Sequence, residues 1–234
     1  MGYLEENRDK NQSTPGGELC QVFGASEKAN ASIALVKMYV GEQGAYHYHD
    51  NITETYVFAK GSGRIVINGV ENEICPGDVY EIPPKNGHLI IADSEMEFEC
   101  ICTPPWEEEH EFIIPEGKTV NDSVIGKKQN FEENTKLNNG GEIAIQKLSK
   151  GKTIQNVVAN NYVEVYYFPI GTGKILINGF EKEIHEGECF LVNPNDIVVI
   201  HAESDMTFSK VKDQNVLSLN KKTSREPGDD EENR

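Results

Sequence analysis

Three histidines and one glutamate have the residue types and spacing to bind a metal ion. His47 and His49 lie two residues apart in an apolar-rich run, Glu54 follows them, and His88 comes after a Pro-Pro-Lys-Asn-Gly turn. Residues i and i+2 of a strand project from the same face, so an extended run presents both His47 and His49 on one side. Imidazole and carboxylate groups are ligands of divalent transition metals. The sequence therefore predicts a metal site at these four residues.

Paired glycines and prolines surround these residues and place them in two blocks. The first block has the form His-x-His-x-x-x-x-Glu and is followed by Gly61 and Gly63, and the second runs from Gly77 through Pro84 to His88. The two blocks resemble the two conserved motifs of the cupin superfamily. The family often has an asparagine a few residues after the last histidine, where Ala92 and Asp93 stand here.

This resemblance implies a small antiparallel barrel that binds one divalent transition metal ion. By the same resemblance His47, His49, Glu54 and His88 are the metal ligands. The ion would be iron, manganese, nickel or zinc, since the resemblance does not fix its identity.

Short strand-like runs separated by Gly, Pro and Asn turns fill the first half of the chain. Asn68-Gly69 is a strong signal for a tight hairpin turn. Many short strands joined by such turns indicate an all-β barrel or sandwich. The predicted strands are 19–23, 31–40, 46–59, the hairpin 64–75, 79–82, 88–92 and 96–101.

The second half of the chain repeats the first. Ile143 corresponds to Ile33, and Phe208 corresponds to Phe98. Both pairs are 110 residues apart, so the two halves align between them without a gap. Such internal similarity indicates a duplicated domain. With the cupin resemblance, we predict an all-β chain of two tandem double-stranded β-helix (jelly-roll) barrels, a bicupin.

The second copy lacks the histidines. Adding 110 to the ligand positions gives Val157, Ala159, Glu164 and Val198, so only the carboxylate is kept. We therefore expect a barrel without a metal site, with a drier interior, that packs against the first barrel through the apolar outer strands. His185 and His201 do not fit the motif and are expected at the surface or the barrel rim.

These observations divide the chain into five parts. We expect a flexible arm at 1–17, the metal-binding barrel at 18–120, a linker at 121–142 and the metal-free barrel at 143–219. The charged residues 220–234 contain almost no apolar side chains and are predicted to be a disordered tail.

Composition excludes some partners and indicates a compartment. The formal charge of −17 argues against nucleic acid and anionic membranes as partners, because both bind lysine and arginine. The chain has no secretory signal and no apolar run long enough to span a membrane, and its odd number of five cysteines fits a reducing compartment. We therefore expect a cytoplasmic protein. Cys100 and Cys102 share one face of a strand and are expected to be small buried apolar residues.

Fold resemblance alone does not choose a reaction, so three functions stay open. The first is a sugar or sugar-phosphate isomerase or epimerase with the metal as Lewis acid, and an Ile-Cys-Thr-Pro-Pro-Trp segment also resembles small cupins related to mannose-6-phosphate isomerase. Tyr56 and Glu81 are the acid–base candidates, and Tyr56 has the strand parity of Glu54. The alternatives are an Fe(II) dioxygenase of a small molecule and a metal-dependent binding protein. In all three cases we expect the partner to be a small molecule, and the protein is either a single chain or a homodimer.

Overall fold

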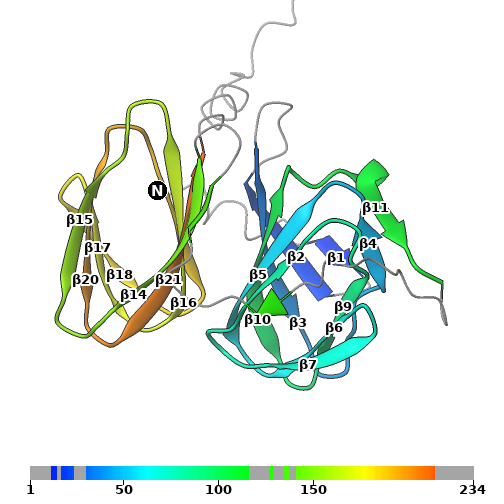
Figure 1. Cartoon of the computed structure of the whole chain (residues 1–234). Helices are drawn as coiled ribbons and strands as arrows, with labels where there is room; N and C mark the ends of the chain where they lie inside the picture. Colours follow the sequence, from blue (N-terminus) through cyan, green and yellow to red (C-terminus); the bar gives the residue numbers. More distant parts are fainter. Residues whose placement is uncertain are drawn as a thin grey trace, which may run out of the picture.

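The computed structural model contains two antiparallel β-barrels that lie side by side (Figure 1). It describes residues 12–14, 17–23, 30–115, 127–128, 134–136 and 141–213. Nearly all of the regular structure is strand, and one short 3₁₀ turn, Glu108–His110, precedes β11. The predicted all-β fold with two tandem barrels is confirmed.

Two sheets form the first barrel, coloured blue to green in Figure 1. The larger sheet has the order β1 (Gln12–Thr14), β2 (Gly17–Phe23), β3 (Ser32–Met38), β10 (Met96–Thr103), β5 (Thr53–Lys60), β8 (Val79–Ile82) and β12 (Lys127–Lys128). The smaller sheet has the order β11 (Glu111–Ile113), β4 (His47–His49), β9 (His88–Ala92), β6 (Gly63–Ile67) and β7 (Val70–Ile74).

The second barrel repeats this arrangement with fewer strands. One sheet has the order β13 (Asn134–Lys136), β14 (Glu142–Leu148), β21 (Met206–Asp213), β16 (Val163–Ile170) and β19 (Glu188–Val192). The other has the order β15 (Thr153–Val157), β20 (Ile197–Ala202), β17 (Gly173–Ile177) and β18 (Phe180–Ile184). Asn68 and Asn178, at the tips of the equivalent hairpins, both have positive φ, as such tight turns require.

Alternation along the strands divides the apolar residues between three clusters. On β10, Phe98 packs inside the first barrel, whereas Ile101, on the opposite face of the strand, belongs to a cluster shared by both barrels. On β21, Phe208 packs inside the second barrel and Val211 belongs to the shared cluster. β5 and β16 are buried on both faces along most of their length, because one face lines the interior of a barrel and the other lies in the shared cluster.

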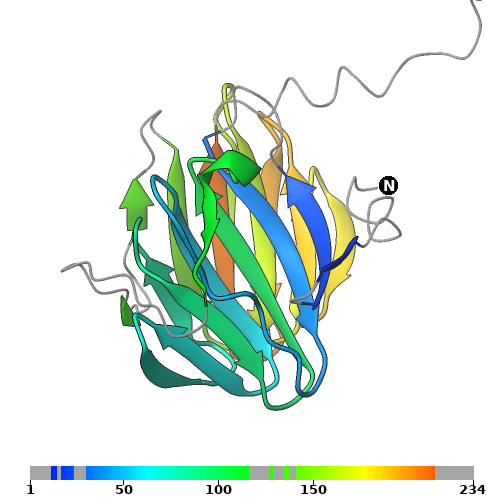
Figure 2. The same cartoon turned by 90° about the vertical axis from the view of Figure 1, so that its right-hand side faces the viewer.

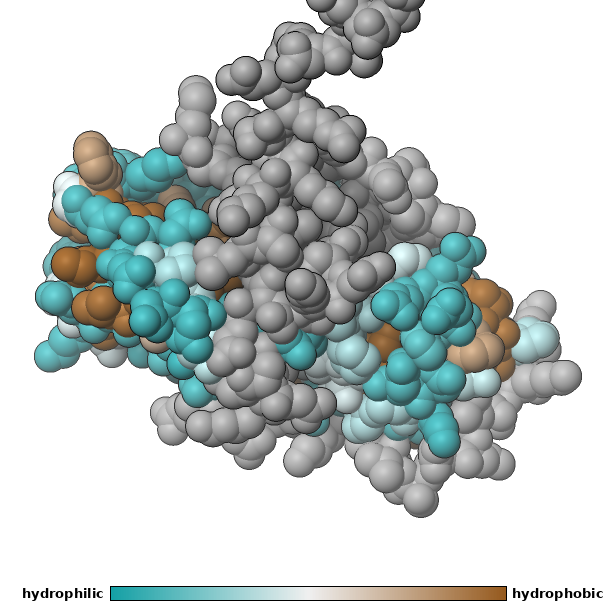
Figure 3. Space-filling view, turned by 90° about the horizontal axis from the view of Figure 1, so that it is seen from above, coloured by the Kyte–Doolittle hydropathy of each residue, from teal (hydrophilic) through white to brown (hydrophobic). Residues whose placement is uncertain are grey.

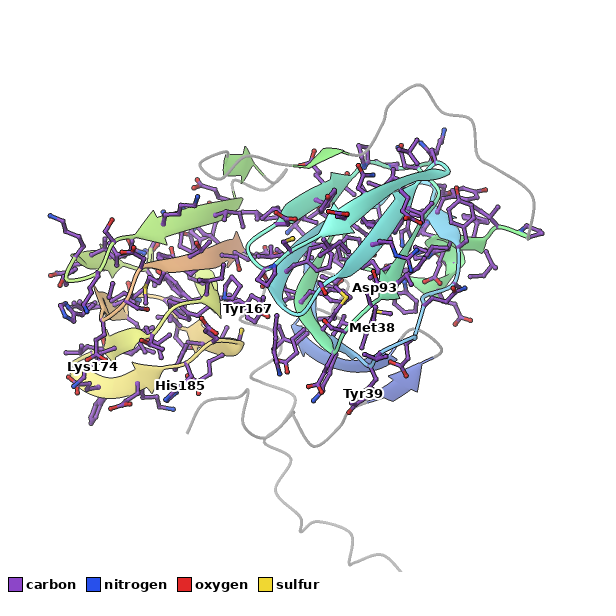
Figure 4. The ribbon with its side chains drawn as sticks, turned by 90° about the horizontal axis from the view of Figure 1, so that it is seen from below. Met38, Tyr39, Asp93, Tyr167, Lys174 and His185 are labelled. Carbon is purple, nitrogen blue, oxygen red and sulfur yellow. The ribbon has the colours of Figure 1, made fainter. Side chains whose placement is uncertain are left out.

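The shared cluster is the interface between the barrels. Residues of β3, β5, β8 and β10 meet residues of β14, β16, β19 and β21, and Tyr167 lies between the barrels in Figure 4, while Met38 lies within the first barrel. Figure 2 looks onto the first barrel with the second behind it. The expectation that the apolar outer strands pack against each other is confirmed. The buried members of this cluster are Ala31, Ile33, Val57, Ala59, Val79, Ile101, Ile143, Ile145, Val163, Val165, Tyr167, Cys189 and Val211.

Equivalent residues of the two copies meet at the centre of this interface. Ser209 donates a hydrogen bond of 2.6 Å to Oε2 of Glu99, and the two positions are 110 residues apart. Asn30 donates to Asp213 from both its backbone and its side chain. The Oε1 atom of Glu99 is buried without a hydrogen-bond partner, and burial raises the pKa of Glu99 to about 7.

Some strands lie inside the segments predicted as arm and linker. β1 lies within residues 1–17 and extends the larger sheet by pairing with β2. β12 and β13 lie within residues 121–142, and they pair with β8 and β14 respectively. The predicted disordered tail at 220–234 lies outside the described residues.

On the face shown in Figure 3, the described residues are mostly hydrophilic, with separate apolar groups among the polar ones. Two exposed apolar side chains of the second barrel are Val157, which is 58% exposed, and Phe180, which is 81% exposed. Among the described residues, the structure has no helix long and apolar enough to cross a membrane.

The buried carboxyl group of Glu99 makes the stability of the interface depend on pH. Its pKa is higher in the folded chain than the ordinary 4.5, so its protonated form stabilises the fold below about pH 4.5. This contribution is lost as the pH rises through about 7, at a cost on the order of 3 kcal/mol. We predict that Glu99→Gln raises the melting temperature at pH 8 by about 5 °C or more and leaves it nearly unchanged at pH 4.5.

The matched control is Glu97→Gln on the same strand. Glu97 forms a 3.4 Å ion pair with exposed Lys60, and such pairs contribute little to stability. Scanning calorimetry at the two pH values measures both variants. An equal shift at both pH values, or a larger shift for Glu97→Gln, would contradict the assignment.

Candidate metal centre

The pairing of two short strands, β4 and β9, brings the three histidines together. His47 and His49 are the two ends of β4, a three-residue strand between β11 and β9. His47 and His49 have the same parity and therefore face the same side. In the ladder, His47 lies directly opposite His88, the first residue of β9. The neighbouring strand β9 thus supplies the third imidazole, and its pairing with β4 fixes the position of His88 beside His47.

Glu54 on β5 faces this histidine group from the opposite sheet. Its Oε2 lies 2.5 Å from Nε2 of His88, 3.4 Å from Nε2 of His49 and 3.8 Å from Nε2 of His47. Glu54, His49 and His88 are all at most 4% exposed. Within the described residues, His47, His49 and Glu54 form a group whose ligand atoms lie within 4.8 Å of one another. The structure therefore brings all four predicted ligand residues to one place.

Each imidazole is oriented by a backbone carbonyl at its other nitrogen. The carbonyls of Ala45, His110 and Asn86 lie 2.9, 3.1 and 2.9 Å from the Nδ1 atoms of His47, His49 and His88 respectively. A carbonyl oxygen only accepts, so each Nδ1 carries the hydrogen, and in a neutral ring Nε2 keeps its lone pair.

The three Nε2 lone pairs then point toward the Glu54 carboxylate. Together these atoms form a cluster of electron-pair donors with a negative electrostatic potential. Nε2 of His49 is buried and has no hydrogen-bond partner. A metal cation among these atoms would use each lone pair, and metal-bound histidines in proteins usually donate their other N–H to a carbonyl or carboxylate. The donor set therefore fits a divalent transition metal ion.

Protons supply the positive charge when no metal does. Burial disfavours the charged imidazolium of His47, but Glu54 outweighs this effect and raises its pKa to about 9. Burial likewise disfavours ionised Glu54, yet His88 and the other imidazoles hold its pKa well below its ordinary value. A metal ion and protons thus compete for the same ligand atoms, so metal affinity is expected to rise with pH.

Asn86 fixes the third histidine and was not identified from the sequence. It is 1% exposed and donates to the carbonyls of Pro83 and Pro84, while its own side-chain oxygen accepts from Asn68. Its carbonyl orients His88. An asparagine two residues before the ligand histidine in a Pro-Pro-Lys-Asn-Gly turn was the available signal. The carbonyl of His110 that orients His49 had no such signal, because any residue type can supply it.

The two acid–base candidates lie in different places. The hydroxyl of Tyr56 is buried, 3.1 Å from Oε2 of Glu54 and 3.2 Å from Nε2 of His88, and burial with the neighbouring carboxylate raises its pKa well above the ordinary value. Glu81 alternates on β8 with Tyr80 and Ile82, which pack inside the barrel. Its side chain therefore points away from the interior, and the structure does not bring Glu81 to the site.

Cys100 and Cys102 also face Glu54, which differs from their expected role as simple apolar residues. Their Sγ atoms lie 3.5 and 3.6 Å from Oε1 of Glu54. Cys102 is buried, whereas Cys100 is half-buried together with Ala34 and Val36 on the adjacent β3.

The lysines and the arginine of residues 30–115 lie at the surface and not in the site. Lys37 and Lys60 pair with Glu95, Arg64 pairs with Asp93, and Lys85 is exposed. Within this described range, no cationic side chain other than the histidines reaches the ligand group.

The second barrel differs from the predicted alignment by one residue at this point. In the first barrel His47 lies opposite His88, but in the second Asn156, not Val157, lies opposite Val198. The carbonyl of His49 accepts from Lys85, and the carbonyl of Val158 accepts from Asn195, which is the residue equivalent to Lys85. Asn156 and Val158 therefore occupy the positions of His47 and His49.

The assignment of Val157 and Ala159 to these positions was wrong. Both are exposed, Val157 by 58%. The physical reason is one extra residue in the first barrel between the Gln43–Ile91 bridge and the His47–His88 pair, whereas β15 runs without interruption. The predicted surface positions of the other two histidines agree with the structure: His185 is exposed at the outer side of the second barrel (Figure 4), and His201 is half-buried beside Thr153.

Protein donors surround the retained carboxylate of Glu164. Asn156 Nδ2 and the Tyr166 hydroxyl donate to its Oε2 at 2.7 and 2.5 Å, and the Lys210 ammonium lies 3.9 Å from its Oε1. Lys210 stands 110 residues after Cys100. The second interior is thus not wholly apolar, and its described residues include no group of metal ligands around Glu164.

Comparison with known proteins agrees with this geometry. Residues 34–104 match the cupin domain family. An L-ectoine synthase of Teredinibacter turnerae is 28% identical over 107 residues, which are 44% of this chain and 81% of that protein. An L-ectoine synthase of Hahella chejuensis is 25% identical over 105 residues, 44% of this chain and 80% of that protein.

Two solved structures resemble the whole double barrel. The salicylate 1,2-dioxygenase of Pseudaminobacter salicylatoxidans has a TM-score of 0.60 at 13% identity, covering 94% of this chain and 83% of that one. The oxalate decarboxylase of Bacillus subtilis has a TM-score of 0.55 at 14% identity, covering 88% and 74%. At such identities the similarity shows the fold alone.

We predict that His49→Ala lowers the affinity for divalent transition metals at least 10-fold and leaves the barrel folded. Loss of a group that only orients a ligand already costs about 10- to 100-fold, and loss of a ligand itself should cost no less. The fold persists because both barrels have extensive apolar cores. Isothermal titration with Ni²⁺ and circular dichroism measure the two properties. Loss of β structure in the metal-free wild-type chain would show that the ion is required for folding instead.

The register of β15 predicts where a metal site can be built in the second barrel. Asn156→His, Val158→His and Val198→His in a Lys210→Cys background should create a Ni²⁺ site with Glu164. Val157→His, Ala159→His and Val198→His in the same background should not, because the first two positions face solvent. Stoichiometry is measured in chains that also carry His47→Ala and His49→Ala. Equal binding by both designs would contradict the register.

Proposed function

Because the chain is a two-barrel member of the cupin superfamily, we propose that its first barrel is a metal-dependent enzyme acting on a small molecule. One divalent transition metal ion would be held by His47, His49, Glu54 and His88. The observation that carries the proposal is the orientation of the three imidazoles: each donates from Nδ1 to a carbonyl and presents Nε2 to one carboxylate oxygen.

The bound ion would act as a Lewis acid toward a carbonyl or hydroxyl oxygen of the substrate. The protein supplies the remaining functions. Tyr56 holds a proton on its hydroxyl, within hydrogen-bond distance of Glu54 and His88. Phe58 and Phe98 pack around Tyr56 and exclude water from that side.

The charges around the site favour a substrate without a phosphate group. Phosphate recognition uses arginine and lysine, and within residues 30–115 all such side chains lie in surface ion pairs or are exposed. We therefore narrow the class to an unphosphorylated sugar or hydroxycarbonyl compound, which binds the metal through its own oxygens. The similarity of just over 100 residues of this chain to L-ectoine synthases supports a small-molecule substrate.

Isomerisation or epimerisation is the reaction that we propose first. In the route that we propose, a proton moves at the carbon next to a carbonyl group, and metal coordination of that carbonyl would favour the step. Tyr56 is the described hydroxyl placed to exchange the proton, directly or through one water molecule. Glu81 is not part of this proposal because its side chain points away from the interior.

Dioxygenation of a small molecule is the second candidate. It is favoured by one observation: among the described residues, no carboxylate, lysine or imidazole outside the ligand group lies beside Tyr56 to serve as a general base. Glu99, the other buried carboxylate of β10, lies at the interface between the barrels. A reaction with oxygen at Fe(II) needs no such base, and two histidines with a carboxylate suit that ion.

The two reactions are separated by one experiment in two measurements. Protein reconstituted with Fe²⁺, Mn²⁺, Ni²⁺ or Zn²⁺ is incubated in D₂O with a panel of unphosphorylated aldoses, ketoses and hydroxyketones. Proton NMR detects deuterium at the carbon next to the carbonyl, and an oxygen electrode records uptake. We predict deuterium incorporation without oxygen uptake, and a loss of about 10²-fold in Tyr56→Phe, typical for removal of one proton-transfer group.

The control is the double variant His47→Ala/His49→Ala, which should show neither signal. Oxygen uptake by the Fe²⁺ protein with no deuterium incorporation would replace the first candidate by the second. Equal signals from the wild-type chain and the histidine variant would contradict any role of the centre in catalysis.

A further inference from the structure

Glu54 has two oxygens that face different groups of ligands. Its Oε2 faces the three imidazoles, and its Oε1 faces the thiol groups of Cys100 and Cys102. We propose that Cys100, Cys102 and Oε1 of Glu54 bind a second, thiophilic metal ion, such as Zn²⁺, beside the histidine centre.

The strands place these groups by their register. Cys100 and Cys102 have the same parity on β10, and β10 pairs with β5 so that Cys102 lies directly opposite Glu54. Phe98, two residues before Cys100, packs in the core of the first barrel, which shows that this face of β10 is the interior one. Both thiols are therefore held on the same side of the ladder as the carboxylate.

The distances match those of three ligands on one tetrahedral ion. The two Sγ atoms lie 3.9 Å apart, and they lie 3.5 and 3.6 Å from Oε1 of Glu54. With zinc–sulfur bonds of about 2.3 Å and zinc–oxygen bonds of about 2.0 Å, a tetrahedral ion separates two sulfurs by about 3.8 Å and a sulfur from an oxygen by about 3.5 Å. The three ligands are thus close to their binding positions, and a fourth position stays open to water or substrate.

The chemistry of this group differs from that of the histidine centre. Thiolates prefer zinc, copper(I) and other soft ions, whereas imidazole binds a broader range of divalent metals. These three residues form a separate group of potential ligands within 4.8 Å of one another, and it contains both cysteines but no histidine. Cys75, which is exposed, and Cys189, in the interface cluster, belong to no such group among the described residues.

One of the two thiol groups lies among half-buried residues. Cys100 is half-buried, and so are Ala34 and Val36 on the neighbouring strand. Binding converts each thiol to a thiolate, so two protons pass to solvent for each ion bound. The inference goes beyond the proposed function and shares only Glu54 with it, through which the two ions would influence each other.

Cadmium is the probe, because Cd²⁺ bound to thiolates gives an ultraviolet charge-transfer absorption that histidine and carboxylate ligands do not. The reduced, metal-free full chain with His47→Ala and His49→Ala is titrated with Cd²⁺ in weakly buffered solution. We expect one ion per chain, the charge-transfer band, and the release of about two protons per ion. The chain with intact histidines should bind two ions.

Three variants on the His47→Ala/His49→Ala background test the assignment. Cys100→Ser/Cys102→Ser should remove the band and lower the affinity at least 100-fold, and Glu54→Gln should weaken binding while keeping the band. The matched control Cys75→Ser/Cys189→Ala should behave like the background. A band that persists in Cys100→Ser/Cys102→Ser, or a background chain with no band, would overturn the proposal.

Failure here is distinguishable from failure of the proposed function. Cys100→Ser/Cys102→Ser with intact histidines should still bind one Ni²⁺ ion at the first centre. If it does, while the background chain lacks the thiolate band, only the second site is refuted. If Ni²⁺ binding is absent from the chain with all histidines and cysteines intact, the histidine centre is refuted instead.

Discussion

A buried carboxylate needs positive charge or hydrogen-bond donors around it, and this requirement governs the interior of both barrels. In the first barrel Glu54 is 4% exposed and faces three imidazole nitrogens that are turned toward it by backbone carbonyls. An ionised carboxylate in such surroundings is costly unless a cation or protons accompany it. The positions of β4, β5 and β9, and of the Pro-Pro-Lys-Asn-Gly turn with Asn86, all serve to hold this group.

The second barrel meets the same requirement with protein groups alone. Glu164 is 3% exposed and accepts from Asn156 and Tyr166, with the Lys210 ammonium near its other oxygen. The carboxylate and its tyrosine are kept in both copies, but in the second an amide, Asn156, stands in place of His47 and an ammonium, Lys210, stands in place of Cys100. Duplication therefore left one barrel with electron-rich ligands that require a cation and another whose charges are already balanced. The contrast explains why the retained glutamate of the second copy does not indicate a metal site.

The two barrels depend on each other through their outer faces. The outward-facing apolar residues of β5 and β16, such as Val57 and Val165, are buried against the other barrel. Polar contacts cross this apolar interface as well: Ser209 donates to Glu99, its equivalent position in the first copy, and Asn30 donates to Asp213. The second barrel thus contributes structure to the first, because the β5 and β10 strands that carry Glu54, Cys100 and Cys102 have their other faces at this interface.

Residue types and spacing determined much of this protein in advance. The alternation of His47 and His49, the Asn68-Gly69 turn and the repeat at 110 residues were enough to predict two β-barrels and the four residues that meet in the first, because these features depend on local strand and turn geometry. Only the tertiary structure decided that Asn156 and Val158 replace the histidines, since one extra residue before His47 shifts a strand without changing the repeat on either side. It also decided that Glu81 faces away while both cysteines face Glu54. Such facing depends on which strands pair and on which side each barrel is covered, and sequence periodicity within a single strand does not contain that information.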